Sequence, residues 1–246
     1  MPTVTINGKT HRCAPGLTVL QALRQCGEDV ATLCHDERVQ PAATCRLCLV
    51  HVAGHAKPLT ACNTPLADGM VIRTGTPDLE DERRTLLGWL AQHYPQDVPL
   101  EFPERPFHRL LQRYGIWARA QADAARVDAS HVYLRVDMQR CVMCYRCVRI
   151  CAELQGQNVW HVVGHGDSSH IVPGTAPSLS ASACVACGAC VDTCPTAALQ
   201  DRPALGGGNG DPEAHQWPVA ERLPPHECRP QQPLRVATED VDEQRG

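Results

Sequence analysis

Twelve of the fifteen cysteines in this 246-residue chain form three sets of four with spacings suited to binding metal. Two sets share the spacing C-x2-C-x2-C-x3-C: Cys141, Cys144, Cys147 and Cys151, then Cys184, Cys187, Cys190 and Cys194, followed by Pro195. The third set, spaced C-x10-C-x2-C-x13-C, is Cys34, Cys45, Cys48 and Cys62. Four thiolates hold an iron–sulfur cluster, and the repeated spacing is typical of bacterial ferredoxins. The sequence therefore predicts a carrier of single electrons.

The two repeats are expected to exchange ligands, because the fourth cysteine of such a run ligates the other cluster in two-cluster ferredoxins. One [4Fe–4S] cluster is then assigned to Cys141, Cys144, Cys147 and Cys194. The other is assigned to Cys184, Cys187, Cys190 and Cys151. This exchange would join the repeats into one folding unit and hold the clusters close enough for electron transfer.

Zinc is the main alternative to an iron–sulfur cluster, since it also binds four thiolates and C-x2-C pairs. The strict repeats suit zinc poorly, whereas the N-terminal set is less distinctive and leaves zinc more open. A secreted disulfide scaffold is disfavoured because the N-terminus lacks the apolar stretch of a signal peptide. Cys13, Cys26 and Cys228 match no cluster spacing and are predicted to be ordinary thiols.

The elements around the N-terminal set predict a small α+β domain over residues 1–76. Asn7-Gly8 is a strong hairpin signal, and Thr18 is suited to cap a helix. We expect strands at residues 4–6, 10–12, 49–52 and 70–72, and a helix at residues 19–25. A hairpin, a helix and further strands together favour a β-grasp ferredoxin-like fold.

The rest of the chain divides into three predicted regions. A helical connector spans 77–130, a ferredoxin-like domain with two [4Fe–4S] clusters spans 131–202, and a flexible tail spans 203–246. In the connector, apolar periodicity predicts helices at 78–94 and 107–125, with a proline-rich loop at 95–103 between them. In the third region, strands are expected at 131–136, 159–163 and 169–172.

The N-terminal set, with Arg46 and Leu47 inside its C-x2-C pair, resembles the [2Fe–2S] domain of the large iron–sulfur subunit of respiratory complex I. Similar domains begin the catalytic subunit of NAD-dependent formate dehydrogenases, the diaphorase iron–sulfur subunit of NAD-reducing [NiFe] hydrogenases and many [FeFe]-hydrogenases. Residues 137–156 and 184–196 are most similar to the formate dehydrogenase version. The resemblance covers roughly residues 3–202 and implies one [2Fe–2S] cluster on Cys34, Cys45, Cys48 and Cys62.

The connector departs from this family, which usually holds a third cubane there through H-x3-C-x2-C-x5-C. His93 occupies the histidine position, but Asp97, Leu100 and Pro106 occupy the three cysteine positions. We therefore predict that this cluster is absent, that His93 is an ordinary residue at a helix end, and that apolar side chains such as Phe102, Phe107 and Leu110 fill the scaffold. The cofactor prediction is one [2Fe–2S] and two [4Fe–4S] clusters.

The sequence offers no catalytic constellation, dinucleotide-binding turn or P-loop. His161, His165 and His170 lie near the second repeat but are predicted to be solvated hairpin residues. The formal net charge of −4 would become roughly −10 with three oxidised clusters, which disfavours a nucleic-acid partner. The sequence contains no run of eighteen apolar residues, the length that a membrane-spanning helix requires.

The resemblance implies a non-catalytic electron-transfer subunit of a cytoplasmic, hetero-oligomeric, NAD(P)-linked oxidoreductase complex. Its partners would be a flavin-bearing NAD(P)H subunit and a subunit with a metal active site, of formate dehydrogenase first and NAD-reducing hydrogenase next. A free-standing polyferredoxin carrier is the alternative, and a zinc-held assembly module is a more remote one.

Overall fold

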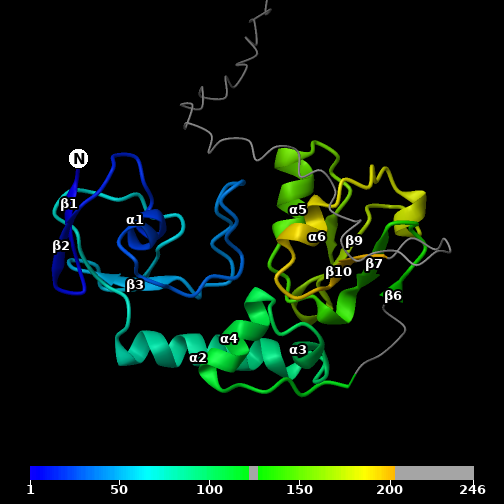
Figure 1. The fold of residues 1–246 in the computed structure, drawn as a ribbon, viewed down its shortest axis with the longest axis horizontal. Helices are drawn as coiled ribbons and strands as arrows, with labels where there is room; N and C mark the ends of the chain where they lie inside the picture. The colour runs from blue at the N-terminus through cyan, green and yellow to red at the C-terminus, as the bar shows by residue number, and fades with distance from the viewer. Residues whose placement is uncertain (122–126, 203–246) are drawn as a thin grey trace, which may run out of the picture. The chain divides into compact units, whose positions relative to one another are not determined.

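The computed structural model describes residues 1–121 and 127–202 (Figure 1). The tail predicted at 203–246, including Cys228, lies outside the described residues, as does the end of the helix predicted at 107–125. No helix within the described ranges is long and apolar enough to cross a membrane. The described part has α+β structure, with three sheets and helices between them.

The N-terminal region is a five-stranded sheet of order β2-β1-β5-β3-β4. Its elements are β1 (Thr3–Ile6), β2 (Lys9–Arg12), α1 (Val19–Gln25), β3 (Leu49–Val52), β4 (Leu59–Thr60) and β5 (Val71–Arg73). Only β1 and β5 pair in parallel. The apolar face of α1 packs with the strands in one buried cluster, which gives the β-grasp arrangement.

Local signals position these elements. Asn7 and Gly8 have φ values of +49° and +83°, and the left-handed pair closes the β1–β2 hairpin as predicted. Thr18 and Gln21 form a capping box at the start of α1. Strand β5 begins one residue later than predicted, and the short strand β4 was not predicted. Two residues carry too little periodicity to reveal a strand.

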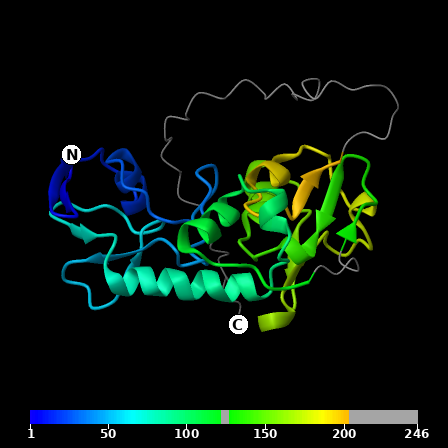
Figure 2. The same cartoon turned by 60° about the horizontal axis from the view of Figure 1, so that its bottom comes forward.

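The connector holds α2 (Pro77–Gln92), α3 (Val98–Glu101) and α4 (Pro106–Tyr114). Helix α4 packs against α2, as Figure 2 shows. The prediction that this last helix continues to residue 125 is wrong. Gly115 adopts a left-handed φ of +63°, which ends the helix, and the chain then runs back so that Ala120 pairs with Pro95. The short helix α3 lies inside the segment predicted as a proline-rich loop.

The C-terminal region contains a three-stranded sheet of order β10-β7-β6 and the hairpin β8-β9. Its strands are β6 (Val127–Asp128), β7 (Leu134–Asp137), β8 (His161–Val163), β9 (His170–Val172) and β10 (Leu199–Asp201). Its helices are α5 (Arg146–Arg149), a π-helical turn at Ile150–Leu154, α6 (Ala189–Thr193) and 3-10 turns at Met138–Arg140, Gly166–Ser168 and Leu179–Ala181.

The pairing of β7 with β10 matters most for the cysteines. Leu199 pairs antiparallel with Val136, and the Asp137 N–H donates to the Ala198 carbonyl at 2.7 Å. Strand β7 leads into the first cysteine repeat, and β10 follows the second. Their pairing therefore brings the end of the second repeat beside the start of the first.

Candidate metal centres

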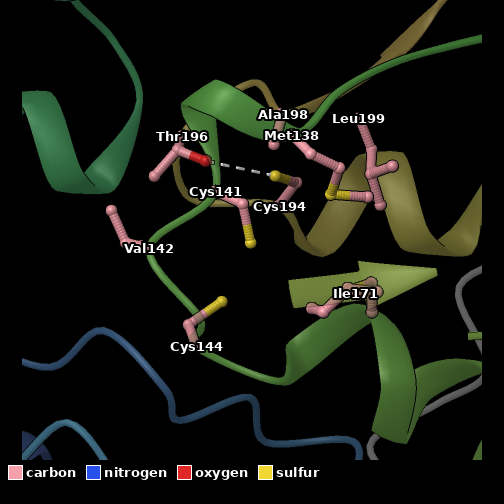
Figure 3. Close-up of a pocket in the computed structure, with 10 residues that line it drawn as sticks. Met138, Cys141, Val142, Cys144, Ile171, Cys194, Thr196, Ala198 and Leu199 are labelled. Atoms are coloured by element: carbon pink, nitrogen blue, oxygen red, sulfur yellow. Dashed lines mark hydrogen bonds between the residues drawn. The ribbon is translucent and has the colours of Figure 1, made fainter. Parts of the chain in front are cut away.

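One cavity of the C-terminal region is lined by Cys141, Cys144, Cys147 and Cys194. Three of these cysteines come from the first repeat and the fourth ends the second repeat. In Figure 3 the sulfur atoms of Cys141, Cys144 and Cys194 border the same space. Apolar side chains, among them Ile171 and Leu199, complete the wall. The cavity therefore combines four soft ligands with an apolar lining.

A second cavity is lined by Cys151, Cys184, Cys187 and Cys190. Here the first repeat contributes the single cysteine and the second repeat contributes three. The structure thus brings together the same two groups of four that exchange of ligands assigns to separate clusters. Leu134, Val159 and Trp160 provide apolar lining. Each cavity has the donor set that a [4Fe–4S] cluster requires.

Left-handed residues shape both cysteine loops in the same way. Met143 and Tyr145 have φ values of +52° and +62°, and the corresponding residues of the second repeat, Ala186 and Gly188, have +56° and +72°. These turns direct backbone N–H groups to sulfur: Met143 N–H donates to Cys141 and Ala186 N–H donates to Cys184, each at 3.4 Å. The strained backbone therefore supplies hydrogen bonds that stabilise thiolate charge.

The apolar walls affect the cysteine thiols. Burial raises the pKa of Cys141 to about 11, and that of Cys144 and Cys190 to about 12. The fully enclosed Cys147 thiol also has a raised pKa, chiefly through burial. Metal ligation requires the thiolate, so cluster insertion at these positions must release protons.

The N-terminal set forms two thiol pairs. The Cys45 thiol donates a hydrogen bond to Cys34 and lowers the pKa of Cys34 to about 5, despite burial. In the same way, the Cys62 thiol donates to Cys48 and lowers the pKa of Cys48 to about 7. Two pairs of sulfurs match a [2Fe–2S] centre, in which each iron takes two protein ligands.

Two cysteines of the N-terminal set pack near the first cavity, whereas Cys48 and Cys62 belong to the core of the β-grasp sheet. Cys34, Cys45, Leu47 and Cys144 belong to one apolar cluster. Polar contacts fix the same junction: Arg38 pairs with Asp192 at 2.8 Å, and the Thr193 hydroxyl donates to Asp36 at 2.7 Å. Burial alone would raise the pKa of Asp36, but hydrogen bonds from Arg38 and Thr193 outweigh it and hold that pKa below its usual range.

The four connector positions are distributed over three helices and their ends. His93 caps the end of α2, Asp97 precedes α3, and Pro106 begins α4. The Leu100 side chain is exposed. Within residues 1–121 and 127–202, no three His, Cys, Asp or Glu side chains converge closely enough to hold a single metal ion. The thiolates of a cluster bind separate irons and therefore lie farther apart than the ligands of a single ion.

Tyr94 and His108 occupy the interior of the connector, and no local pattern in the sequence indicated their role. The Tyr94 hydroxyl lies 2.7 Å from His108 Nε2 and 2.8 Å from the Thr196 carbonyl. Phe107 packs edge-on against Tyr94. Phe107 and Leu110 are buried there, while Phe102 is only partly buried. An aromatic and imidazole network therefore supports the Cys194–Thr196 segment.

The remaining predicted residues lie apart from the cavities. Cys13 is buried in the β-grasp core, and the partly buried Cys26 packs against it. His161, His165 and His170 are exposed on and beside the β8–β9 hairpin. Neither group lines the two cysteine cavities.

Two family models match the chain, one over each cysteine-rich region. Residues 1–77 match a 2Fe-2S iron-sulfur cluster binding domain, and residues 132–200 match the ferredoxin-like domain of NADH-quinone oxidoreductase subunit 3. The chain contains both iron–sulfur domains. Arg83 and Tyr94 belong to the connector between the two matched ranges, 1–77 and 132–200.

Several characterised proteins are similar to most of the chain. An NADH-quinone oxidoreductase subunit of Rhizobium meliloti (strain 1021) is 34% identical over 90% of this chain and 26% of that protein. NADP-reducing hydrogenase subunit HndD of Solidesulfovibrio fructosivorans is 34% identical over 91% of this chain and 38% of that protein. NADPH-Fe(3+) oxidoreductase subunit alpha of Geobacter sulfurreducens (strain DL-1 / KN400) is 31% identical over 82% of this chain and 24% of that protein.

The chain thus spans about a quarter to two fifths of the length of these curated relatives. It also resembles a chain in the crystal structure of an NAD+-reducing [NiFe]-hydrogenase in the H2-reduced state. The TM-score is 0.70 at 26% identity, over 85% of this chain and 90% of that chain. The 2Fe–2S and ferredoxin-like domains are therefore shared with subunits of NAD(P)-linked oxidoreductases.

Proposed function

We propose that the chain is the electron-transfer subunit of a cytoplasmic, hetero-oligomeric, NAD(P)-linked oxidoreductase complex. It would relay single electrons between a flavin subunit and a subunit with a metal active site. The observation that carries this proposal is the grouping of eight cysteines into two cavities, with Cys34 and Cys45 of the N-terminal set in the same apolar cluster as Cys144 of the first. Clusters held in this way transfer electrons, and the chain itself supplies ligands, hydrogen bonds and exclusion of water.

The ligand assignment belongs to this proposal. Cys141, Cys144, Cys147 and Cys194 would hold one [4Fe–4S] cluster, and Cys151, Cys184, Cys187 and Cys190 would hold the other. The 2Fe–2S domain would hold its cluster through Cys34, Cys45, Cys48 and Cys62. The connector would hold none, since the cysteine positions of the third cubane carry Asp97, Leu100 and Pro106.

We propose hydrogen, rather than formate, as the substrate of the complex. The expectation of a formate dehydrogenase depended only on the similarity of the two cysteine repeats to the formate dehydrogenase version. The hydrogenase chain instead matches this chain over 90% of its own length, as a separate subunit of similar extent. The similarity to a hydrogenase subunit from Solidesulfovibrio fructosivorans supports the same choice.

The test is anaerobic purification of the tagged chain from its native cells. Metal and sulfide analysis should give roughly 10 iron and 10 acid-labile sulfide per chain, the sum of one [2Fe–2S] and two [4Fe–4S] clusters. A flavin subunit and a metal subunit should co-purify, and hydrogen should reduce the clusters and NAD(P)+ through the complex.

Other outcomes would distinguish the alternatives. Roughly 14 iron per chain would mean that a third cubane exists with unexpected ligands. A chain that purifies alone and accepts electrons weakly from unrelated reductases would be a free carrier. Reduction by formate but not hydrogen would restore formate as the substrate. About three zinc without sulfide would reject the electron-transfer function.

A further inference from the structure

Arg83 has an unusual position for an arginine. It lies on the buried face of α2, in line with Leu79, Leu87 and Ala91, and is only 3% exposed. A cationic side chain is rarely buried unless its donors are satisfied. The partners of Arg83 therefore indicate what it contributes.

Those partners lie in the cysteine loop of the 2Fe–2S domain. Arg83 Nε donates to the Leu47 carbonyl at 2.9 Å, and Nη2 donates to the Leu49 carbonyl at 2.6 Å. These two carbonyls flank Cys48 in the sequence, and Cys48 is itself almost fully buried. The third donor, Nη1, contacts Glu80 at 2.5 Å. One guanidinium thus holds the backbone on both sides of a predicted cluster ligand.

The loop geometry explains why its carbonyls need this partner. Arg46 adopts a left-handed φ of +56°, and the Leu47 N–H is directed to the Cys45 sulfur. The Cys48 carbonyl accepts from the Ala61 N–H at 3.0 Å, on the side of β4. Carbonyls alternate in direction along an extended segment, so those of Leu47 and Leu49 face the opposite side. The Leu47 and Leu49 carbonyls then point toward α2, where a planar guanidinium fork can bind two acceptors together. A lysine offers no such fork.

The charge of Arg83 is only partly offset. The Arg83 side chain is 4% exposed, whereas the Glu80 side chain is 37% exposed and interacts with solvent and with the Tyr114 hydroxyl. Solvent screens Glu80 more strongly than it screens the buried cation. The Arg83–Glu80 pair therefore contributes a positive electrostatic potential at the Cys45–Leu49 segment, which favours an added electron on a cluster bound there.

We propose that Arg83 is a positioning residue for the [2Fe–2S] centre. It holds the Cys45–Leu49 segment in its ligating conformation, and its charge raises the midpoint potential of the cluster. The step concerned is the gain of one electron by the oxidised cluster from the donor subunit. This inference rests on the proposed function, because it requires a cluster on Cys34, Cys45, Cys48 and Cys62.

The experiment is an EPR-monitored redox titration of the full chain with four variants. Arg83→Met removes the charge and should lower the equilibrium constant for reduction of the [2Fe–2S] cluster about tenfold. For a one-electron couple this is a fall of about 59 mV in the midpoint potential. Glu80→Gln removes the counter-charge and should shift the potential by a smaller amount in the opposite direction. Arg83→Lys keeps the charge and should leave the potential within about twofold of wild type in equilibrium constant, a shift of roughly 18 mV, while the cluster is lost faster to a chelator.

Arg84→Met is the matched control, since Arg84 is exposed on the same helix and donates to the Tyr114 carbonyl instead of the cysteine loop. It should leave the potential unchanged, and all variants should leave both [4Fe–4S] potentials unchanged. If Arg83→Met fails to assemble its cluster, the opposite shift in Glu80→Gln and the faster loss in Arg83→Lys decide the question.

The two possible failures are distinct. A wild-type chain with no [2Fe–2S] signal overturns the proposed function and this inference together. A normal signal whose potential is the same in wild type, Arg83→Met and Glu80→Gln overturns the role of Arg83 alone. Equal chelator sensitivity of wild type and Arg83→Lys would overturn the positioning part.

Discussion

The two cysteine cavities of the ferredoxin-like domain have the same spacing but different surroundings. In the first, Cys144, Cys147 and Cys194 are buried and Cys141 is partly exposed. In the second, Cys151 and Cys190 are buried, Cys184 is partly exposed and Cys187 is exposed. Sequence duplication therefore does not create equal sites.

The connector accounts for part of this difference. Pro195 O accepts from the Phe107 N–H at 3.1 Å, and the Cys194 carbonyl accepts from Arg105 at 3.2 Å. Cys34 and Cys45 add cover, because Cys144 shares their apolar cluster. The loop of the second cavity instead leaves Val185 57% exposed. Because burial and nearby hydrogen bonds tune cluster potentials, the two clusters should differ in potential.

The largest expected effect comes from removing the exchanged ligands. Cys194→Ala should cost the chain about four of about ten irons, and should free Cys141, Cys144 and Cys147 for alkylation. Cys151→Ala should cost the same number and free Cys184, Cys187 and Cys190. Peptide mapping after anaerobic alkylation identifies the freed thiols. The reverse pattern would mean that each repeat holds its own cluster.

The next effect tests the difference in exposure. In the wild-type chain, a water-soluble chelator with an alkylating reagent should label Cys187 and Cys184 several-fold faster than Cys147. The physical reason is that solvent reaches the second cavity through its exposed cysteine. Time-resolved mass spectrometry of the labelled peptides measures the two rates. Simultaneous labelling of both sets would show that the cavities open together.

A smaller effect should come from the left-handed position that the repeats share. Gly188→Val places a β-branched residue at φ +72° and should destabilise the second site by about 1–2 kcal/mol. Tyr145→Gly, at the equivalent position of the first repeat, should be nearly neutral. Relief of the left-handed strain is offset by the greater conformational freedom of glycine in the unfolded chain. The thermal midpoint of cluster loss, followed by absorbance, gives the comparison. Equal destabilisation by the two changes would refute it.

The smallest effect concerns Asp36, which accepts a hydrogen bond from Thr193 at the end of α6. Both cavities depend on this helix, because α6 carries Cys190 of the second cavity and leads directly into Cys194 of the first. Asp36→Asn should destabilise both sites equally, by about 1 kcal/mol. The pKa of Asp36 is depressed in the folded chain, so its contribution is present above the unfolded pKa of about 3.9 and is lost as pH falls below that value. Chelator-driven cluster loss measured from pH 8 to pH 5, above the range in which acid itself destroys the clusters, should show a constant difference between variant and wild type.

An unequal response would contradict this expectation. If Asp36→Asn weakened one cavity alone, α6 would not transmit the contact to both. If the difference between variant and wild type already disappeared near neutral pH, the carboxylate would not be the stabilising form. The exposed Asp192, which pairs with Arg38 beside it, provides a control through Asp192→Asn, whose effect should be close to zero.

The sequence by itself determined the three cysteine sets, the Asn7-Gly8 hairpin, the capped helix α1 and the long helix α2. These features depend on local rules, since spacing, turn chemistry and capping act within a few residues. It also indicated two iron–sulfur domains, which the matched families confirm over residues 1–77 and 132–200. The predicted length of the helix at 107–125 was wrong, because apolar periodicity continues past Gly115 whereas the left-handed backbone of Gly115 ends α4.

The grouping of the eight sulfurs followed from the exchange expected of their spacing, but only the tertiary structure decided how well each sulfur is covered. The pairing of β7 with β10 places Cys194 beside Cys141, and contacts from the connector hold the Cys194–Thr196 segment at the first cavity. Tyr94, Arg83 and Asp36 also acquire their roles through partners between 34 and 157 residues away in the chain. Burial and hydrogen bonding between distant segments have no signature in local spacing, so these contacts could not be predicted from the sequence alone.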